Sequence, residues 1–425
     1  MSEPAPAGSQ GSPARAVARG AGRGLAAALA TAAFAESISI MGFLATGRPF
    51  GLWSFVKIGW LYLLAFHRVG LRLTLGGPLG SSGAPADAAR TYVFTIHAAF
   101  LVGTLLAGWL LVLAGKACAS ERSRTWSTVA TVVGYTAPIA LGASAAVVRL
   151  PGYGIASVQP VGWEAAGFPF VFAIVAVAVG LASSLSRGGV LARAAAGGWR
   201  MLWWSLSLAF VGFLIVAGAR PDASGAYAGS IRREGGLGAI LAANHALAAP
   251  NQSVAMLAVS MGSCDGLYGP GGGWDLACQK RLVGPAALAG FGELARGAPL
   301  ASTGAHVGEA PWWWWLFAIA PAVATVAAGR RAARGSYGVV AAAGAGALFG
   351  AFVAIASWAA SATVRVPAGG TVRLGPSLPR TALFALAWGV VGGLLGALTV
   401  WRGAKDQRQD EELPLEEPPP SPTSE

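Results

Sequence analysis

One residue able to do chemistry lies inside otherwise apolar sequence. Glu36 falls within the run from Leu25 to Leu44, with Ser37 and Ser39 beside it. A carboxylate at membrane depth costs about 3 kcal/mol unless it faces the interior of a helix bundle. Glu36 is therefore a candidate for lining a solute path. In the alternative interpretation, it is a protonated carboxyl group that hydrogen-bonds to a neighbouring helix.

A second set of polar residues interrupts the apolar stretch from Leu237 to Gly262. Proline lacks a backbone N–H and breaks a helix, whereas Asn, His, Gln and Ser side chains supply donors and acceptors. Non-helical backbone survives at membrane depth only where it is buried in protein or lines a watery cavity. We expect a re-entrant loop or a discontinuous helix here, lined by polar candidates; alternatively, these side chains only satisfy the backbone freed by the break. The interrupting residues are Asn244, His245, Pro250, Asn251, Gln252 and Ser253.

A related segment, Phe50 to Arg72, follows the first apolar run. In a helix, its Lys57, Arg68 and Arg72 share one stripe. The segment is therefore interpreted as an interfacial or re-entrant helix rather than a clean span. His67 is a further candidate for the solute path, although an interfacial position is the simpler interpretation.

The cysteines suggest a disulfide rather than a metal site. The chain has 3 Cys and 4 His. Cys264 and Cys278 lie in one Gly-rich hydrophilic loop, so they are a possible disulfide if that loop faces an oxidising compartment. Scattered His and Cys match no zinc pattern, and Asp265 and Asp275 lack the spacing of a calcium loop. We predict no metal, no cofactor and no catalytic residue.

The composition is that of a membrane protein. Of 425 residues, 55% are hydrophobic and only 11% are charged, against about a quarter charged in soluble domains. The net charge of +12 comes from small basic groups between apolar runs, which indicates membrane orientation rather than nucleic-acid binding. The abundance of Ala, Gly and Arg is typical of a high-GC bacterial genome. We therefore expect a bacterial cytoplasmic membrane protein.

The apolar runs predict an all-α polytopic membrane protein. A span needs about 20 mostly apolar residues. Two further segments, Phe50 to Arg72 and Leu237 to Gly262, are doubtful. The eight runs that meet the test well or nearly are Leu25 to Leu44, Tyr92 to Leu113, Trp126 to Val148, Ala165 to Leu185, Trp199 to Ala217, Trp312 to Ala328, Val339 to Ala360 and Thr381 to Trp401.

Features of the first half recur in the second half in the same order. A span ending in Val148-Arg149-Leu150-Pro151-Gly152 matches one ending in Val364-Arg365-Val366-Pro367-Ala368, and each follows a basic loop. Each half reads as span, doubtful segment, outer loop, span, basic loop, span, short loop and span. The expected organisation is a disordered N-terminus 1–24, a first membrane repeat 25–185, a basic linker 186–199, a second membrane repeat 200–401 with an outer loop 263–311, and an acidic, Pro-rich disordered tail 402–425.

Two topologies fit this duplication. If both doubtful segments are re-entrant, eight spans form a 4+4 parallel repeat; if both cross, ten spans form a 5+5 inverted repeat. Short basic loops are retained in the cytoplasm. Only eight spans place all of these loops there, together with both termini, so eight spans are preferred. The loop residues are Lys116, Arg122, Arg124, Arg187, Arg193, Arg200, Arg330, Arg331 and Arg334.

Three classes of function remain open. The first is a transporter or channel-like protein whose two doubtful segments meet to line a path for a small polar or ionic solute. The second is a non-transporting membrane scaffold or regulator that binds protein partners through the outer loop or the acidic tail. The third is a membrane-embedded enzyme acting on lipid or envelope precursors, for which Glu36, His245 and Asp265 are loose candidates. The lipid bilayer is the one partner common to all three classes.

Overall fold

Long apolar helices dominate the chain. The computed structural model describes residues 13–46, 52–75, 92–150, 155–185, 189–219, 247–269, 272–278, 281–283, 307–309, 316–365 and 370–411. This is the architecture of a helical membrane protein. Six helices in these ranges are long and apolar enough to span a bilayer: Pro13–Gly42, Leu101–Ala119, Arg124–Ala145, Gly162–Ser184, Gly338–Ala360 and Leu378–Trp401.

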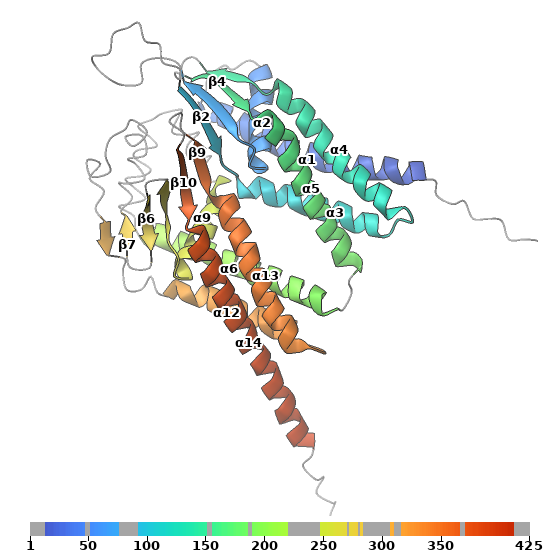
Figure 1. The fold of residues 1–425 in the computed structure, drawn as a ribbon, viewed down its shortest axis with the longest axis vertical. Helices are drawn as coiled ribbons and strands as arrows, with labels where there is room; N and C mark the ends of the chain where they lie inside the picture. Colours follow the sequence, from blue (N-terminus) through green and yellow to red (C-terminus); the bar gives the residue numbers. More distant parts are fainter. Residues whose placement is uncertain are drawn as a thin grey trace, which may run out of the picture.

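Figure 1 shows two sets of helices that diverge from one sheet. The first set is α1 (Pro13–Thr46), α2 (Leu52–Phe66), α3 (Leu101–Ala119), α4 (Arg124–Ala145) and α5 (Gly162–Leu185). The second set is α6 (Val190–Ala219), α9 (Ala249–Ser260), α12 (Ile319–Ala332), α13 (Gly338–Ala360) and α14 (Leu378–Glu411). Each set has its own buried apolar core. We call these sets the first half and the second half.

The strands form one antiparallel ten-stranded sheet in the order β3-β4-β1-β2-β9-β10-β5-β6-β7-β8. The halves join where β2 pairs with β9. The predicted all-α class is therefore corrected, although helices predominate. The strand bounds are β1 (Leu71–Leu75), β2 (Tyr92–His97), β3 (Val148–Leu150), β4 (Ile155–Pro160), β5 (Asp265–Gly269), β6 (Gly272–Cys278), β7 (Arg281–Val283), β8 (Val307–Glu309), β9 (Ala362–Arg365) and β10 (Thr371–Pro376).

Several predicted boundaries are wrong because local propensity and packing outweigh mean hydropathy. The run from Tyr92 starts as β2, whose aromatic and β-branched residues favour a strand, and α3 begins only at Leu101. Within the loop 263–311, strands β5 to β8 extend the sheet. Parts of the terminus 1–24, the linker 186–199 and the tail 402–425 belong to α1, α6 and α14.

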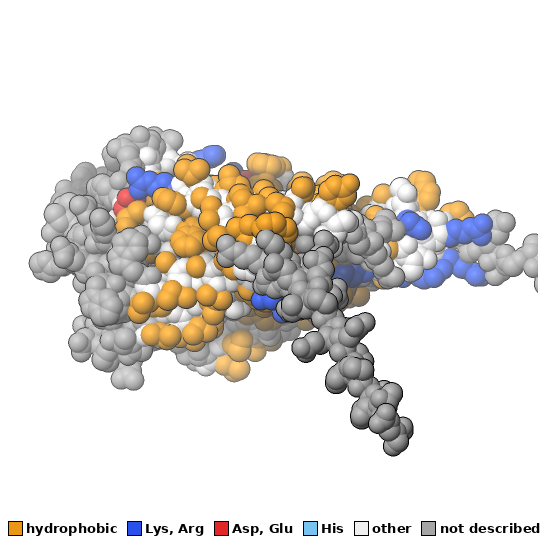
Figure 2. All heavy atoms as spheres, turned by 90° about the horizontal axis from the view of Figure 1, so that it is seen from below, with side chains coloured by type: hydrophobic (Ala, Val, Ile, Leu, Met, Phe, Trp, Pro, Cys, Tyr) orange, Lys and Arg blue, Asp and Glu red, His pale blue; other side chains and the backbone are white. Residues whose placement is uncertain are grey.

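Small residues allow the long helices to pack closely. Gly24 of α1 contacts the backbone of Thr131 in α4, and Gly346 of α13 contacts the backbone of Gly389 in α14. Contacts of this kind are typical of helices associating in lipid, where close backbone approach replaces the hydrophobic driving force. The lipid-facing surface in turn carries exposed apolar side chains, which cover much of the helices in Figure 2.

The sheet and the helix-connecting loops lie at opposite ends of the helices. The strands precede or follow the same ends of α3, α4, α5, α13 and α14. At the other end, Arg23 near the start of α1 pairs with Glu121 in the α3–α4 loop, and Gly396 of α14 lies beside Arg330 of α12. We call the two ends the sheet face and the loop face.

The short helices α2 and α9 run from the sheet face into the helix sets and do not reach the loop face. α2 begins beside the sheet-side end of α1, where Ser39 Oγ donates to the Phe55 carbonyl at 3.0 Å. α9 begins with Pro250 in its first turn, which tolerates proline, so Pro250 does not break the described helix. After both helices the chain turns back into the sheet, as β1 and β5.

Candidate functional site at the junction of the two halves

The chain turns sharply where α2 ends. The Val69 amide donates to the Leu64 carbonyl at 3.1 Å, and Arg68 has a φ of 59°. This left-handed position after a helix usually holds glycine, because a Cβ there costs about 1 kcal/mol. Arg68 is nevertheless buried, with 5% of its surface exposed. The turn therefore places a guanidinium group inside the protein.

Arg68 crosses from the first half to the last turn of α13 in the second half. Its Nη1 donates to the carbonyls of Trp358, Ala359 at 3.1 Å and Ser361 at 2.6 Å. Its Cζ also lies 4.3 Å from the ring centroid of Trp358. The last carbonyls of a helix lack partners within the helix and carry partial negative charge, so a buried cation is well placed there.

Asn251 makes the reciprocal connection from α9. Its Nδ2 donates to the carbonyls of Ala99 at 2.6 Å and Ala360 at 3.2 Å, and its Oδ1 accepts from the Leu101 amide at 3.1 Å. Asn251 thus caps the first turn of α3 in the first half and also binds α13. Together with Arg68, it concentrates side chains from both short helices at residues 358–361.

A row of polar residues crosses the sheet beside this point. Tyr268 of β5 pairs with Arg373 of β10, which pairs with Thr363 of β9, which pairs with His97 of β2. Paired residues on neighbouring strands share a face and lie about 5 Å apart. The Arg373 Cζ lies 5.0 Å from the Tyr268 ring centroid. The row therefore spans both halves across the β2–β9 seam.

Glu164 anchors the first-half end of this row. Its Oε2 accepts from the Gly70 amide at 2.6 Å, and His97 Nε2 donates to both carboxylate oxygens at 3.1 Å. Glu164 lies in the first turn of α5, where the helix dipole favours a negative charge. One carboxylate therefore fixes the start of β1, the end of β2 and the start of α5.

Asp265 lies near the second-half end of the row. Burial raises the pKa of its carboxyl group to about 6, against a smaller lowering by Arg373. Its Oδ1 and the Nη1 of Arg373 are buried without a hydrogen-bond partner among the described residues. Burial, followed by Asp275, raises the pKa of Tyr268 to about 12. The junction thus contains two arginines, Arg68 and Arg373, which repel each other, and one carboxyl group beside Arg373.

The predicted candidates Glu36 and His67 do not join this junction. The Glu36 carboxyl group packs against Gly59 of α2, between α1 and α2. His67 is buried rather than interfacial: its Nδ1 donates to the Leu63 carbonyl at 2.8 Å, and its Nε2 accepts from the Tyr135 hydroxyl at 2.7 Å. Both ring nitrogens of His67 are occupied, which describes a neutral core histidine.

The polar candidates predicted between Leu237 and Gly262 do not all lie at the junction. Asn251 lies at the junction. Gln252 is half-buried in the first turn of α9, and Ser253 is buried, with its Oγ donating to the Ala249 carbonyl at 3.0 Å. That bond satisfies the helix backbone and leaves Ser253 no role at the junction. Asn244 and His245 lie outside the described residues.

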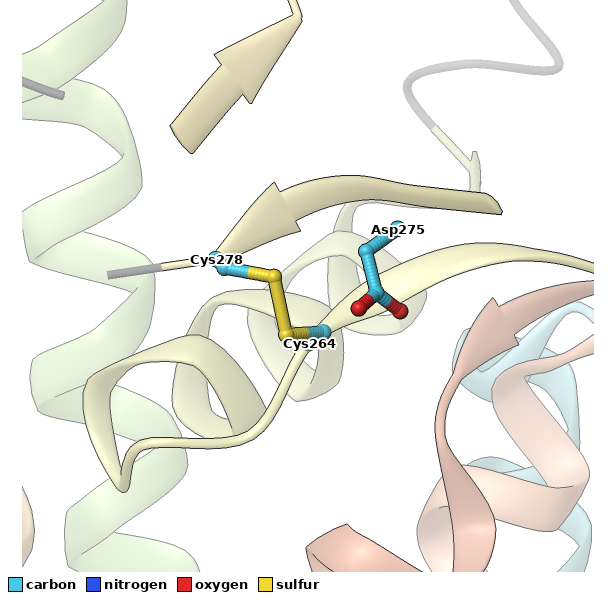
Figure 3. A group of neighbouring side chains, drawn as sticks. All are labelled: Cys264, Asp275 and Cys278. Atoms are coloured by element: carbon cyan, nitrogen blue, oxygen red, sulfur yellow. A yellow bond between two sulfur atoms is a disulfide. The ribbon is translucent and has the colours of Figure 1, made fainter. Parts of the chain in front are cut away.

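Cys264 and Cys278 form a disulfide that joins the start of β5 to the end of β6 (Figure 3). Asp275 lies beside it, and the two sulfurs and the carboxylate lie within 4.8 Å of one another. Because the sulfurs are bonded to each other, they are not thiolate ligands for a metal. The Asp275 carboxylate instead accepts from the Tyr268 hydroxyl at 3.0 Å and from Arg380 at 3.3 Å. This arrangement stabilises the outer part of the sheet.

The most connected residues of the junction were not singled out by sequence reasoning. The sequence places Arg68 only in a basic stripe and does not single out His97, Glu164 or Arg373. A signal for Glu164 does exist, because it is the one carboxylate at the start of its apolar run. Comparisons with protein-family models, curated proteins and solved structures found no match for this chain.

Proposed function

We propose that the chain is an eight-span membrane protein built as a 4+4 parallel repeat, in which α2 and α9 are re-entrant helices. The strand order supports this. The first-half order β3-β4-β1-β2 has a counterpart in the second-half order β9-β10-β5-β6. Helix partners correspond as well, since α1 packs on α4 as α6 packs on α13, and α3 packs on α5 as α12 packs on α14.

The turns after α2 and α9 support the repeat in atomic detail. Gly262 has a φ of 101°, and the Ser263 amide donates to the Ala258 carbonyl at 3.0 Å, as Val69 does to Leu64. The next bonds also correspond. The Val161 amide donates to the Gly70 carbonyl, and the Ser377 amide to the Cys264 carbonyl, each at 2.8 Å. Coincidence does not readily produce matching bonds in matching order.

The proposed orientation places the loop face in the cytoplasm and the sheet face outside. Basic residues in short loops favour the cytoplasmic side. On the loop face these include Arg122, Arg330 and Arg334, and Figure 2 shows Lys and Arg gathered toward the end where α1 begins. This orientation also puts the Cys264–Cys278 disulfide outside, where oxidation is expected.

We further propose transport of a small ionic solute, with the junction as its binding site. One observation carries this proposal: Arg68, in the turn after α2, and Asn251, in α9, converge on the last carbonyls of α13. Discontinuous helices whose ends meet at a repeat interface are typical of secondary transporters. The junction is closed by its own hydrogen bonds, so the structure corresponds to an occluded state in this proposal. A solute would exchange when Arg68 or Asn251 releases α13.

Flux into proteoliposomes tests this proposal. Wild-type chain is reconstituted and assayed with a panel of small anions, cations and neutral polar solutes. For a transported anion, Arg373→Gln is expected to reduce flux at least about tenfold, because it removes a half-buried positive charge worth more than about 1.4 kcal/mol to the bound anion. Arg365→Gln is the matched control, since Arg365 is exposed on the neighbouring strand β9, and it should leave flux within about twofold.

The second candidate is a non-transporting scaffold, and the same closure favours it. Arg68 Nη1 and the Asn251 amide group bind protein backbone, and the disulfide joins two strands of the outer sheet. If the wild-type chain moves no solute of the panel, or if Arg373→Gln transports like wild type, transport through the junction is wrong. A non-transporting scaffold is then the better-supported function.

A further inference from the structure

A polar pocket lies on the loop face of the first half, far from the junction. Its volume is about 220 Å³. It opens between the first turns of α1 and the loop that joins α3 to α4. Its lining residues are Ala16, Arg19, Arg23, Ser120, Glu121, Arg122 and Ser123.

One arginine of this pocket pairs with a carboxylate, whereas Arg19, whose Nε donates to the Arg15 carbonyl at 3.4 Å, and Arg122 do not. Arg23 Nη1 lies 2.7 Å from Glu121 Oε1 and donates to Ser127 Oγ at 3.4 Å. Arg19 and Arg122 are exposed, and no described carboxylate pairs with either of them. The pocket therefore carries three guanidinium groups against one carboxylate, a net charge of +2 (3 − 1).

Glu121 is the one carboxylate among the residues that line the pocket. It is buried at 9% exposure, and neither of its carboxylate oxygens receives a hydrogen bond of normal geometry. The pocket thus combines two arginines that no described carboxylate neutralises with one ion pair, Arg23–Glu121. Such a set fits a phosphate group.

At the corresponding place in the second half, the described residues are arranged differently. There Arg193 Nη1 donates to the Arg334 carbonyl at 2.7 Å, and its Nη2 donates to the Ser336 carbonyl. The guanidinium group of Arg193 is therefore hydrogen-bonded to the backbone of the loop. The difference between the halves shows that the first-half pocket is not a general consequence of basic residues on the loop face.

Apolar surface adjoins the pocket. Trp126, one turn after Ser123 on α4, is 60% exposed, and Val17 and Leu25, which flank the two arginines of α1, are 39% and 43% exposed. Aromatic side chains of this kind favour the headgroup level of a bilayer. A ligand with both a phosphate and acyl chains could therefore satisfy the pocket and its surroundings at once.

We propose that this pocket binds the phosphodiester headgroup of an anionic phospholipid. Arg19 and Arg122 bind the phosphate, and Glu121 holds Arg23 in place beside them. The chemistry shared with a soluble ligand is the phosphate itself. Acyl chains along α1 and α4 distinguish the lipid from free phosphate.

The test uses the full-length chain purified in detergent, with phosphatidylglycerol, phosphatidylcholine and inorganic phosphate as separate probes. Native mass spectrometry counts bound lipid, and the thermal unfolding midpoint reports stabilisation. The variant Arg19→Gln/Arg122→Gln removes the two unpaired arginines. Arg330→Gln/Arg334→Gln removes the same charge from exposed residues of the loop face, outside the pocket.

Wild type is expected to bind phosphatidylglycerol in preference to phosphatidylcholine. The pocket variant should lose at least about tenfold in affinity, while the control stays near wild type, because each basic residue near a headgroup contributes about 1 kcal/mol. Equal losses in both variants, or no preference in wild type, would overturn the proposal. Equal stabilisation by inorganic phosphate would overturn the lipid assignment. Unchanged midpoints without lipid would show that both variants fold.

Discussion

The turns after α2 and α9 have the same backbone path but different residues. In the second half, Gly262 takes the left-handed position, as helix C-termini usually require. In the first half, Arg68 takes it and accepts the strain of a side chain at positive φ. In this position, Arg68 donates hydrogen bonds to the carbonyls at the end of α13, in the other half. The first-half turn therefore binds the opposite half, whereas the second-half turn contacts α14 within its own half, through Met261 and Ser263.

A second difference lies where the last helix of each half begins. Glu164 in α5 binds Gly70 and His97, whereas Arg380 in α14 pairs with Asp275. A carboxylate suits a helix N-terminus, and an arginine does not. Arg380 is also 60% exposed at its side chain. The first half is therefore fixed by buried polar bonds here, and the second half depends more on its disulfide.

The largest expected effect comes from removing that disulfide. Cys264→Ser/Cys278→Ser opens a cross-link between residues 14 apart, which should cost about 3 kcal/mol of unfolding free energy. Hydrogen exchange should accelerate in β5 and β6 but not in β1. Cys118→Ser, at the lone buried thiol of the first half, is the control. Unchanged exchange in β5 and β6 would show that the second half does not depend on the disulfide.

Arg68→Gly is the next largest expected change. It relieves about 1 kcal/mol of backbone strain but leaves three buried carbonyls of the α13 terminus without their donor. We expect a net loss of about 2 kcal/mol and faster hydrogen exchange near Trp358. Gly262→Ala should cost about 1 kcal/mol through strain alone, without affecting α13. If Arg68→Gly stabilises the protein, the backbone strain at Arg68 costs more free energy than its hydrogen bonds to α13 contribute. The proposed difference between the two turns is then wrong.

Asp265→Asn should change the pH dependence of stability. Burial raises the folded-state pKa to about 6 from 3.8, so the native state binds more protons between these values. Stability from this group is therefore fully present below about pH 4 and is lost as pH rises through 6, by on the order of 1–2 kcal/mol. Unfolding midpoints at pH 4 and pH 7 should differ by less in Asp265→Asn than in wild type. Parallel profiles would contradict a buried, titrating Asp265.

The smallest predicted effect concerns Glu164→Gln. The neutral amide keeps its shape but weakens the charge-assisted bonds to Gly70 and His97, at a cost of about 1 kcal/mol. Arg380→Gln, at the corresponding position of the second half, should change stability by less than about 0.5 kcal/mol, because the pair is exposed. Denaturant unfolding in detergent measures both. Equal losses of unfolding free energy in Glu164→Gln and Arg380→Gln would contradict this second difference between the halves.

Sequence reasoning located most of the long helices and much of the organisation around them. Apolar runs of sufficient length predicted the helices, and the matched motifs at Val148 and Val364 both lie in strands that follow a helix, β3 and β9. The second of these strands, β9, pairs antiparallel with β10. Asn251, singled out as a polar residue in an apolar stretch, lies at the junction. Glu36 and His67 do not, because a polar residue in apolar sequence can equally be satisfied within its own half.

The amino-acid sequence by itself determined the membrane class, most of the helices and the recurrence of motifs, because hydropathy and helix length are local properties read along the chain. Only the tertiary structure decided that Arg68 binds α13, that His97 lies in line with Arg373, and that the strands of both halves form one sheet. These contacts join residues far apart in sequence, and their partners are largely backbone carbonyls, which every residue type carries. No pattern of side chains along the chain can therefore specify them.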